Sequence, residues 1–265
     1  MSLLWTILHL VVASNIFSPY QALATDSQDP PLLLISLDGF MPSYVQDQRY
    51  KDLPLPNLRA FLREGTYAES VENILPSLTY PAHTTILTGV SPSRHGIFNN
   101  VFLDPKLTNT DTWYWFSSDI KSQTMWDVAA GRGLRSANID WPVSIGAPVT
   151  VNLPQYWRDD LDLDHRYWLG MAHGAREYLQ DAEKRLGNYP LNRWDLVSDR
   201  LRGEYIKDVI THFRPQFLTA YLSSVDETSH HQGLSSKELR EALIGVDKII
   251  GDIDAQAKRT YPQGY

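Results

Sequence analysis

One continuous apolar run, PLLLISLDGF at residues 31–40, constrains the fold of this chain more than any other feature. A run without polar alternation is typical of a strand that is buried on both faces of a parallel sheet. A second run of this kind, QFLTAYLSSVD, occupies residues 216–226. The first run leads to Asp38 and the second to Asp226. We therefore predict two buried strands, each of which delivers a carboxylate at its carboxyl end.

Segments with the apolar spacing of amphipathic helices alternate with these strands. Helices are predicted at residues 55–65, 80–89, 122–133, 197–213 and 235–261, and a further strand at 134–142. The first of these helices ends in Gly65, as a glycine C-cap. The alternation predicts an α/β fold, a mainly parallel sheet with helices on both faces. Ligands bind beyond the carboxyl ends of the strands in such folds, so Asp38 and Asp226 become candidate site residues.

The composition limits the classes of function. The chain has 265 residues, of which 43% are hydrophobic, and this is enough for one large domain or two small ones. Its net charge of -7 and the lack of a long basic run argue against a nucleic-acid duplex as partner. The absence of cysteine excludes disulfides, a thiolate nucleophile and thiolate metal ligands.

The first residues have the pattern of a secretory signal peptide. An apolar stretch at residues 3–12 is too short to span a bilayer, and Ala22 and Ala24 form a small-x-small cleavage pattern before a polar segment. A retained anchor or a buried helix is the alternative. We expect a signal peptide at residues 1–24, and export of residues 25–265 to a periplasm or outside the cell, without a stable membrane span.

A divalent metal site is indicated by the segment VDETSHHQG. Asp226 and His230 lie four residues apart in it, a carboxylate and an imidazole that suit Zn²⁺, and Asp38 could supply another carboxylate. Spacing favours His230 over its neighbour His231. Metal coordination lowers the pKa of a hydroxyl, so a threonine or serine within residues 73–100 would need no Ser-His-Asp arrangement. Each feature alone also fits ordinary structure: an exposed pair, an Asp-Gly turn or a helix cap.

Three segments together carry a resemblance to a known family. They are LLLISLDGF, NILPSLTYPAHTTILTGVSPSRHGIFNN and SVDETSHHQG, and the intermediate segment MWDVAAGRGLRSANIDWP agrees as well. In order, spacing and flanks they resemble the nucleotide pyrophosphatase/phosphodiesterase (type I phosphodiesterase) family of the alkaline phosphatase superfamily. The resemblance covers roughly residues 31–260. It implies an alkaline-phosphatase-like fold and a phosphodiesterase with two zinc ions and a threonine nucleophile.

The resemblance also implies roles for individual residues. Thr79 would be the nucleophile, and Asp38 and Thr79 would bind one zinc ion. Asp226 and His230 would bind the other zinc ion. Asn100 would donate a hydrogen bond to a non-bridging phosphoryl oxygen in the transition state.

Other polar residues near Thr79 fit the reaction less well. Thr79 lies just before the helix predicted at residues 80–89, where free backbone N–H groups favour a phosphate. The remaining hydroxyls precede the turn or lie along the helix: Ser77, Thr84, Thr85 and Thr88. We expect His83 and His95 to be structural, with His95 supporting the turn before Ile97.

One motif tests whether the chain could belong to the sulfatases, a neighbouring family of the superfamily. Sulfatases require Cys or Ser in C/S-x-P-x-R, whereas VSPSR places Val90 at that position and Arg94 at its end. The sequence therefore argues against a sulfatase. Phosphonate hydrolases and phosphomonoesterases share the metal scaffold and stay open.

The sequence departs from the family pattern after the last motif. Family members continue into an S-D-H-G-M-like segment and a distant histidine, which complete both metal shells, and no D-H-G occurs here. Two protein ligands per zinc ion are fewer than the usual three or four. We expect an incomplete fold, the N-terminal part of a phosphodiesterase domain, with weak zinc binding unless a C-terminal segment completes it. The alternative is a catalytically inactive exported fragment or binding protein.

The substrate class is predicted only in outline. The resemblance favours a nucleotide-like phosphodiester or pyrophosphate, and the sequence assigns no substrate-binding residue. The aromatic cluster at residues 113–116 could stack on a base or form a packed loop.

Overall fold

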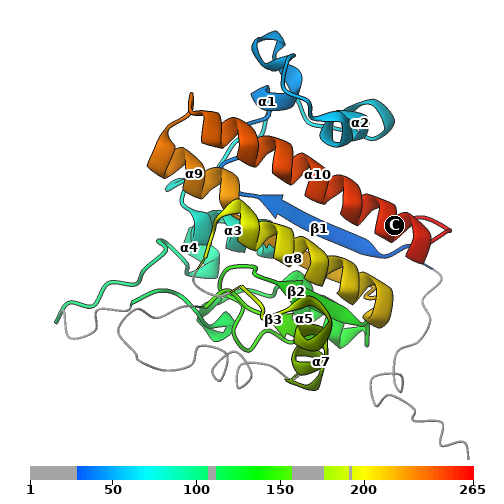
Figure 1. The fold of residues 1–265 in the computed structure, drawn as a ribbon. Coiled ribbons are helices and arrows are strands. Elements are labelled where there is room, and N and C mark those ends of the chain that lie inside the picture. Colours follow the sequence, from blue (N-terminus) through cyan, green and yellow to red (C-terminus); the bar gives the residue numbers. More distant parts are fainter. Residues whose placement is uncertain (1–28, 107–111, 157–175, 191–192) are drawn as a thin grey trace, which may run out of the picture.

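The centre of the molecule is a sheet of four parallel strands, seen in a computed structural model that describes residues 29–106, 112–156, 176–190 and 193–265 (Figure 1). The strands lie in the order β1-β4-β2-β3. Their bounds are Leu32–Leu37 for β1, Ser136–Ile139 for β2, Val151–Leu153 for β3 and Phe217–Leu222 for β4. The predicted strands at residues 31–40, 134–142 and 216–226 are therefore present, and β3 is a strand that the sequence did not predict. Strand β4 is buried along its whole length as predicted, but β1 lies at the edge of the described sheet and none of its residues is fully buried, so the burial predicted for it is wrong.

Strands β1 and β4 pair in parallel along their whole length. The register runs from Leu32 opposite Phe217 to Leu37 opposite Leu222, so both strands end at the same edge of the sheet. Asp38 follows β1 directly, as predicted. Asp226 does not end the second strand, because the chain turns after Leu222 into helix α9 (Ser224–Gln232) and Asp226 lies in the first turn of that helix.

One face of the sheet is covered by α8 (Leu196–Asp208), its π-helical continuation η4 (Val209–Phe213) and α10 (Lys237–Thr260) (Figure 1). Helix α10 begins with Ser236 as its N-cap, whose hydroxyl accepts from the amide of Leu239. The apolar stripe of these helices packs on one set of strand residues, and the shared core includes Ala137, Ile139, Leu218, Ala220, Tyr205, Ile206, Val246 and Ile250. Burial of this stripe is the main force that holds the helices on the sheet.

The opposite face carries α3 (Thr79–Thr88) and α5 (Met125–Gly131). A second core there joins Leu87 and Trp126 of these helices to Phe217 and Tyr221 of β4. Helix α5 begins with a reciprocal capping box between Thr124 and Asp127. With helices on both faces of a parallel sheet, the α/β architecture predicted from the sequence is confirmed.

Most of the remaining elements are short, whereas the longest of them, α7 (Arg176–Leu186), contributes Leu179 and Ala182 to the first core. The others are α1 (Ser43–Gln46), η2 (Gln48–Tyr50), α2 (Pro56–Glu64), α4 (Pro92–His95) and η3 (Ser117–Asp119). Helix α2 ends at the predicted Gly65, but this residue is extended rather than left-handed, with φ -112°. Left-handed glycine caps end α3 and α4 instead, where Gly89 has φ 68° and Gly96 has φ 84°.

In the part of the chain that the structure describes, no helix is long and apolar enough to cross a membrane. The signal peptide predicted at residues 1–24 lies outside the described residues.

Candidate active site at the carboxyl ends of β1 and β4

Asp38 is held at the carboxyl end of β1 by donors from three directions. Its Oδ2 accepts from the hydroxyl of Tyr221 at 2.7 Å and from the hydroxyl of Thr79 at 3.2 Å. Its Oδ1 accepts from the amide of Gly39 at 3.0 Å. The carboxylate therefore has a fixed orientation toward the first residue of α3.

Thr79 begins helix α3, and the N-cap residue Leu78 offers no side-chain acceptor to the first turn. The acceptor comes from Asn100, whose Oδ1 receives the amide N–H of Tyr80 at 2.9 Å. The sequence had predicted that these first amides would be free for a phosphate, and for Tyr80 this is wrong. Because Asn100 accepts through its oxygen, its NH₂ group is the part that can donate to a ligand.

Asp226 and His230 lie on one side of α9, one turn apart. The carboxylate Oδ1 of Asp226 is 3.5 Å from Nε2 of His230. Burial and, to a smaller extent, the charge of Asp38 raise the pKa of Asp226 to about 6, although His230 opposes the shift. The two carboxylates thus face each other closely enough to repel, which a cation between them would relieve.

Gly39 lets α9 approach the end of β1. A Cβ on Gly39 would stand 2.6 Å from Cα of Asp226, and the residue has φ +68°, a conformation that glycine adopts without strain. The contact joins the turn after β1 to the first turn after β4. Asp38 and Asp226, far apart in sequence, are therefore neighbours because no side chain separates the two turns.

A cavity of about 440 Å³ lies beside these groups. Its lining includes four of the residues predicted from the sequence: Thr79, Asn100, Asp226 and His230. It also includes residues that the sequence did not single out for the site: Tyr80, Gln155, Trp194, Tyr221, Ser223 and Glu227. Tyr221 had a readable signal, since Phe217, Thr219 and Tyr221 alternate along β4 toward the face that carries α3 and α5.

The aromatic cluster at residues 113–116 is divided between the cavity and the core. Trp113 lines the cavity, whereas Trp115 is buried and the rings of Trp113 and Trp115 stack at 5.8 Å. Phe116 is half exposed. Of the two alternatives, a packed loop describes Trp115, and only Trp113 of this pair is placed to meet a ligand in the cavity.

His83 and His95 have structural contacts, as expected. His83 is buried and bridges Ser36, at 2.8 Å, and the carbonyl of Thr79, at 2.7 Å. His95 accepts the amide N–H of Ile97 at 3.1 Å, which supports the turn predicted for it. His231 pairs with Glu227 at 2.9 Å and is not among the residues that line the cavity.

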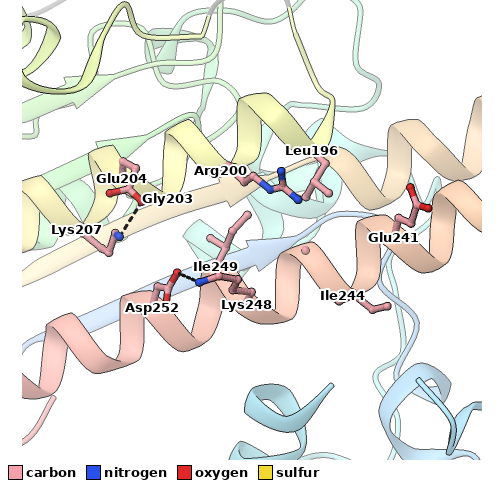
Figure 2. Close-up of a pocket in the computed structure, with 11 residues that line it drawn as sticks. Leu196, Arg200, Gly203, Glu204, Lys207, Glu241, Ile244, Lys248, Ile249 and Asp252 are labelled. Carbon is pink, nitrogen blue, oxygen red and sulfur yellow. Dashed lines mark hydrogen bonds and ion pairs between the residues drawn. The ribbon is translucent and has the colours of Figure 1, made fainter. Parts of the chain in front are cut away.

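A larger groove, of about 640 Å³, lies away from these residues between α8 and α10 (Figure 2). Two charged pairs line it, Lys207 with Glu204 and Lys248 with Asp252, each at 2.8 Å. The groove contains none of the candidate residues. Chemistry rather than size therefore places the candidate site in the smaller cavity.

The donor types at the site fit a divalent metal ion. Two carboxylates, one imidazole and one hydroxyl come from Asp38, Asp226, His230 and Thr79, and the mutual repulsion of the carboxylates favours a cation. Among the described residues, no group of three or more His, Asp or Glu side chains that could hold a metal is found. The donors fit zinc in kind, and in number they fall short of a closed coordination shell.

Comparison with known proteins gives a family model over most of the chain. The model described as type I phosphodiesterase / nucleotide pyrophosphatase matches residues 32–261. The human ectonucleotide pyrophosphatase/phosphodiesterase family member 1 is 29% identical over 237 residues, which cover 84% of this chain and 21% of the relative. Venom phosphodiesterase 2 of Crotalus adamanteus is 27% identical over 84% of this chain and 24% of the relative.

Solved structures share the fold at lower identity. Murine ectonucleotide pyrophosphatase/phosphodiesterase 5 superposes with a TM-score of 0.57 at 21% identity, over 87% of this chain and 53% of that chain. An inactive variant of the murine protein was solved in complex with AMP. Phosphonoacetate hydrolase of Sinorhizobium meliloti superposes with a TM-score of 0.60 at 17% identity, over 86% of this chain and 54% of that chain. The chain thus spans about half the length of these solved chains and a fifth to a quarter of the curated relatives.

Proposed function

The chain belongs to the type I phosphodiesterase / nucleotide pyrophosphatase family, and on that premise we propose that it provides the nucleophile and metal-binding residues of a zinc-dependent phosphodiesterase. One observation carries the proposal: the hydroxyl of Thr79 donates to Asp38 beside a cavity that Asp226 and His230 also line. Nucleophile, carboxylates and imidazole from three separate segments meet at one edge of the sheet, where α/β folds bind ligands.

Asp38 and Thr79 would hold one zinc ion, and Asp226 and His230 the other. Zinc in such a site lowers the pKa of a coordinated hydroxyl and offsets phosphoryl charge. Thr79 Oγ1, after losing its proton to solvent, would attack phosphorus while the bond to the leaving oxygen breaks on the opposite side. Water would then attack the same phosphorus, the bond to Thr79 Oγ1 would break, and Thr79 would take up a proton again. Asp38 Oδ2 accepts the hydrogen bond of this hydroxyl and so orients it before attack.

Asn100 has two functions in this scheme. Its oxygen holds the amide of Tyr80, which fixes the side chain at the start of α3. Its NH₂ group then donates to a non-bridging phosphoryl oxygen, where charge develops in the transition state. A side chain that is already held by one bond loses little freedom when it makes the second.

We propose a nucleotide-like phosphodiester or pyrophosphate as substrate. The names of the relatives point to nucleotide pyrophosphates and phosphodiesters, and a structural neighbour was solved with AMP. Trp113 offers an aromatic ring at the cavity on which a base can stack. Export to a periplasm or outside the cell, after removal of residues 1–24, agrees with relatives that are named as ectoenzymes and venom proteins.

A second candidate is an exported protein that retains the fold and binds a phosphorylated ligand without cleaving it. No group of three or more His, Asp or Glu side chains that could hold a metal is found among the described residues, and this favours the second candidate. It predicts ligand binding in the cavity without turnover, whether or not zinc is added.

Hydrolysis of a p-nitrophenyl phosphodiester separates the two candidates. The purified chain would be assayed with and without added Zn²⁺, alongside Thr79→Ala. Thr88→Ala is the matched control, because it makes the same change at the other end of α3, where the hydroxyl donates to the carbonyl of Thr84 and accepts the amide N–H of Val90. Zinc-dependent turnover that is lost in Thr79→Ala and kept in Thr88→Ala supports the enzyme. A folded, zinc-loaded protein without turnover supports the binding protein.

A further inference from the structure

Helix α9, which carries Asp226 and His230, begins without a cap of its own. The residue before it, Ser223, makes no side-chain bond to the first turn. Its first amides are instead satisfied from α8: Oδ2 of Asp199 accepts the N–H of Ser224 at 2.7 Å, and Oδ1 accepts the N–H of Ser223 at 3.3 Å. A fully buried carboxylate on another helix therefore caps α9, with charge-assisted bonds at the positive end of its dipole.

Asp199 is itself held by a buried arginine. Nη1 of Arg202 lies 3.0 Å from Asp199 Oδ1, and Nε of the same guanidinium lies 2.8 Å from Oδ2 of Asp140, which follows β2. A further donor of Arg202, Nη2, reaches the carbonyl of Arg193 at 2.6 Å. The guanidinium thus links α8 to the end of β2. Asp199, which the same guanidinium holds in place, in turn fixes the junction of β4 and α9.

The first turn of α9 is also constrained on the side away from Asp199, because it packs directly against the turn after β1. Cα of Asp226 stands where a Cβ on Gly39 would be only 2.6 Å away, so α9 rests directly on the turn that carries Asp38. A small displacement of the first turn of α9 changes the relation of Asp226 to Asp38. Asp199 does not line the cavity and touches none of the candidate ligands.

We propose that Asp199 is a positioning residue of the site: its carboxylate sets the first turn of α9 and thereby places Asp226 and His230 to bind a divalent metal ion opposite Asp38. The proposal rests on the proposed function for its metal, and on the described hydrogen bonds for its geometry. It adds a residue from α8 that lies outside every motif of the family resemblance.

The test compares the same substitution at two buried carboxylates of one helix. Asp199→Asn keeps the shape and leaves Arg202 paired with Asp140, so the buried cation is not orphaned. Asp208→Asn is the matched control, because Asp208 is also a buried carboxylate of α8 but binds Arg185 and Tyr178 of α7, away from α9. Asp199→Glu is a further variant, which retains the charge that faces Arg202 and displaces the carboxylate by one methylene.

Two measurements are made on each folded variant. The first is amide hydrogen exchange at residues 223–227 in the metal-free protein, which reports the first turn of α9 directly. The second is the affinity for Zn²⁺, measured by calorimetric titration of the metal alone. For Asp199→Asn we expect exchange at these amides to be about tenfold faster or more, as for the loss of a charge-assisted bond, and zinc affinity to fall about tenfold or more.

Asp208→Asn should change neither quantity at α9, although it lowers the unfolding temperature. Equal exchange at residues 223–227 in Asp199→Asn and Asp208→Asn would overturn the proposal, and so would faster exchange with unchanged zinc affinity. If Asp199→Asn does not fold, faster exchange in Asp199→Glu supports the proposal and unchanged exchange overturns it. Absence of zinc binding in the unsubstituted chain would refute the proposed function, while the exchange data still decide whether Asp199 sets α9.

Discussion

The hydroxyl of Thr79 donates a hydrogen bond of 3.2 Å to Oδ2 of Asp38, so the start of helix α3 and the end of strand β1 meet through their functional groups. The same oxygen accepts from Tyr221 at 2.7 Å. A carboxylate with two such donors has little rotational freedom. The contact therefore prepares the hydroxyl and its acceptor for chemistry before any ligand arrives.

Removal of the Tyr221 hydroxyl should weaken catalysis more than it weakens the fold. Tyr221→Phe deletes the donor that orients Asp38 but keeps the ring in the core beside α3. We expect kcat/KM to fall about tenfold, as for loss of an outer-shell partner, with an unfolding free energy lower by about 1 kcal/mol. Tyr205→Phe is the control, since that buried hydroxyl donates only to the carbonyl of Gly187. An equal loss of activity in both variants would contradict the orienting role of Tyr221.

A side chain at Gly39 should separate the two halves of the site. In Gly39→Ala the new Cβ meets backbone atoms of Asp226, which cannot move aside as a flexible side chain can. Gly89→Ala supplies the control, because Gly89 also has φ +68° but has no neighbour within 4 Å of the added Cβ. The strain of φ > 0 costs about 1 kcal/mol in both variants. In urea unfolding, Gly39→Ala should lower the free energy of unfolding by more than this amount, and it should also bind zinc less tightly. Similar losses of unfolding free energy in the two variants would argue against the close contact.

Trp113 should contribute to binding of the base but not to the chemistry. Trp113→Ala removes a ring at the cavity wall, and we expect KM for a p-nitrophenyl ester of a nucleoside monophosphate to rise about tenfold, the effect of one base–aromatic stack. KM for methyl p-nitrophenyl phosphate, which lacks a base, should change much less. Phe116→Ala, at a half-exposed position in the same segment, is the control. A proportional rise for both substrates would indicate that Trp113 supports the loop rather than the base.

Protonation of His95 should destabilise the fold as the pH falls. Burial lowers the pKa of His95, whose Nδ1 accepts the amide of Ile97 in the neutral form. Because the pKa of His95 is lower in the folded than in the unfolded protein, the unfolded chain binds the proton first. The contribution of neutral His95 to stability is therefore fully present above about pH 6.5 and is lost as the pH falls through the lower pKa of the folded protein. His95→Asn retains an acceptor and does not titrate. Between about pH 7.5 and 5, the unfolding free energy of the unsubstituted protein should therefore fall more steeply than that of His95→Asn, and parallel curves would contradict the assignment.

Local patterns in the sequence determined much of the architecture. Continuous apolar runs identified β1 and β4, although only β4 is buried along its whole length, and the 3.6-residue spacing identified α8 and α10. Asp38 followed from its place directly after β1. His230 was predicted from its spacing to Asp226 and from the family resemblance, Thr79 and Asn100 were predicted from the resemblance, and the structure brings all three to one cavity.

Only the tertiary structure decided how these residues meet. Strand β4 ends at Leu222, and α9 then carries Asp226 to Gly39. Asn100 accepts the amide N–H of Tyr80, and Asp199 of α8 accepts the amide N–H of Ser224 at the start of α9. Periodicity reports which face of an element is buried, and it contains no information on which distant element covers that face. These contacts depend on strand order, register and the close approach of two turns, and the chain fixes them only when the whole sheet is assembled.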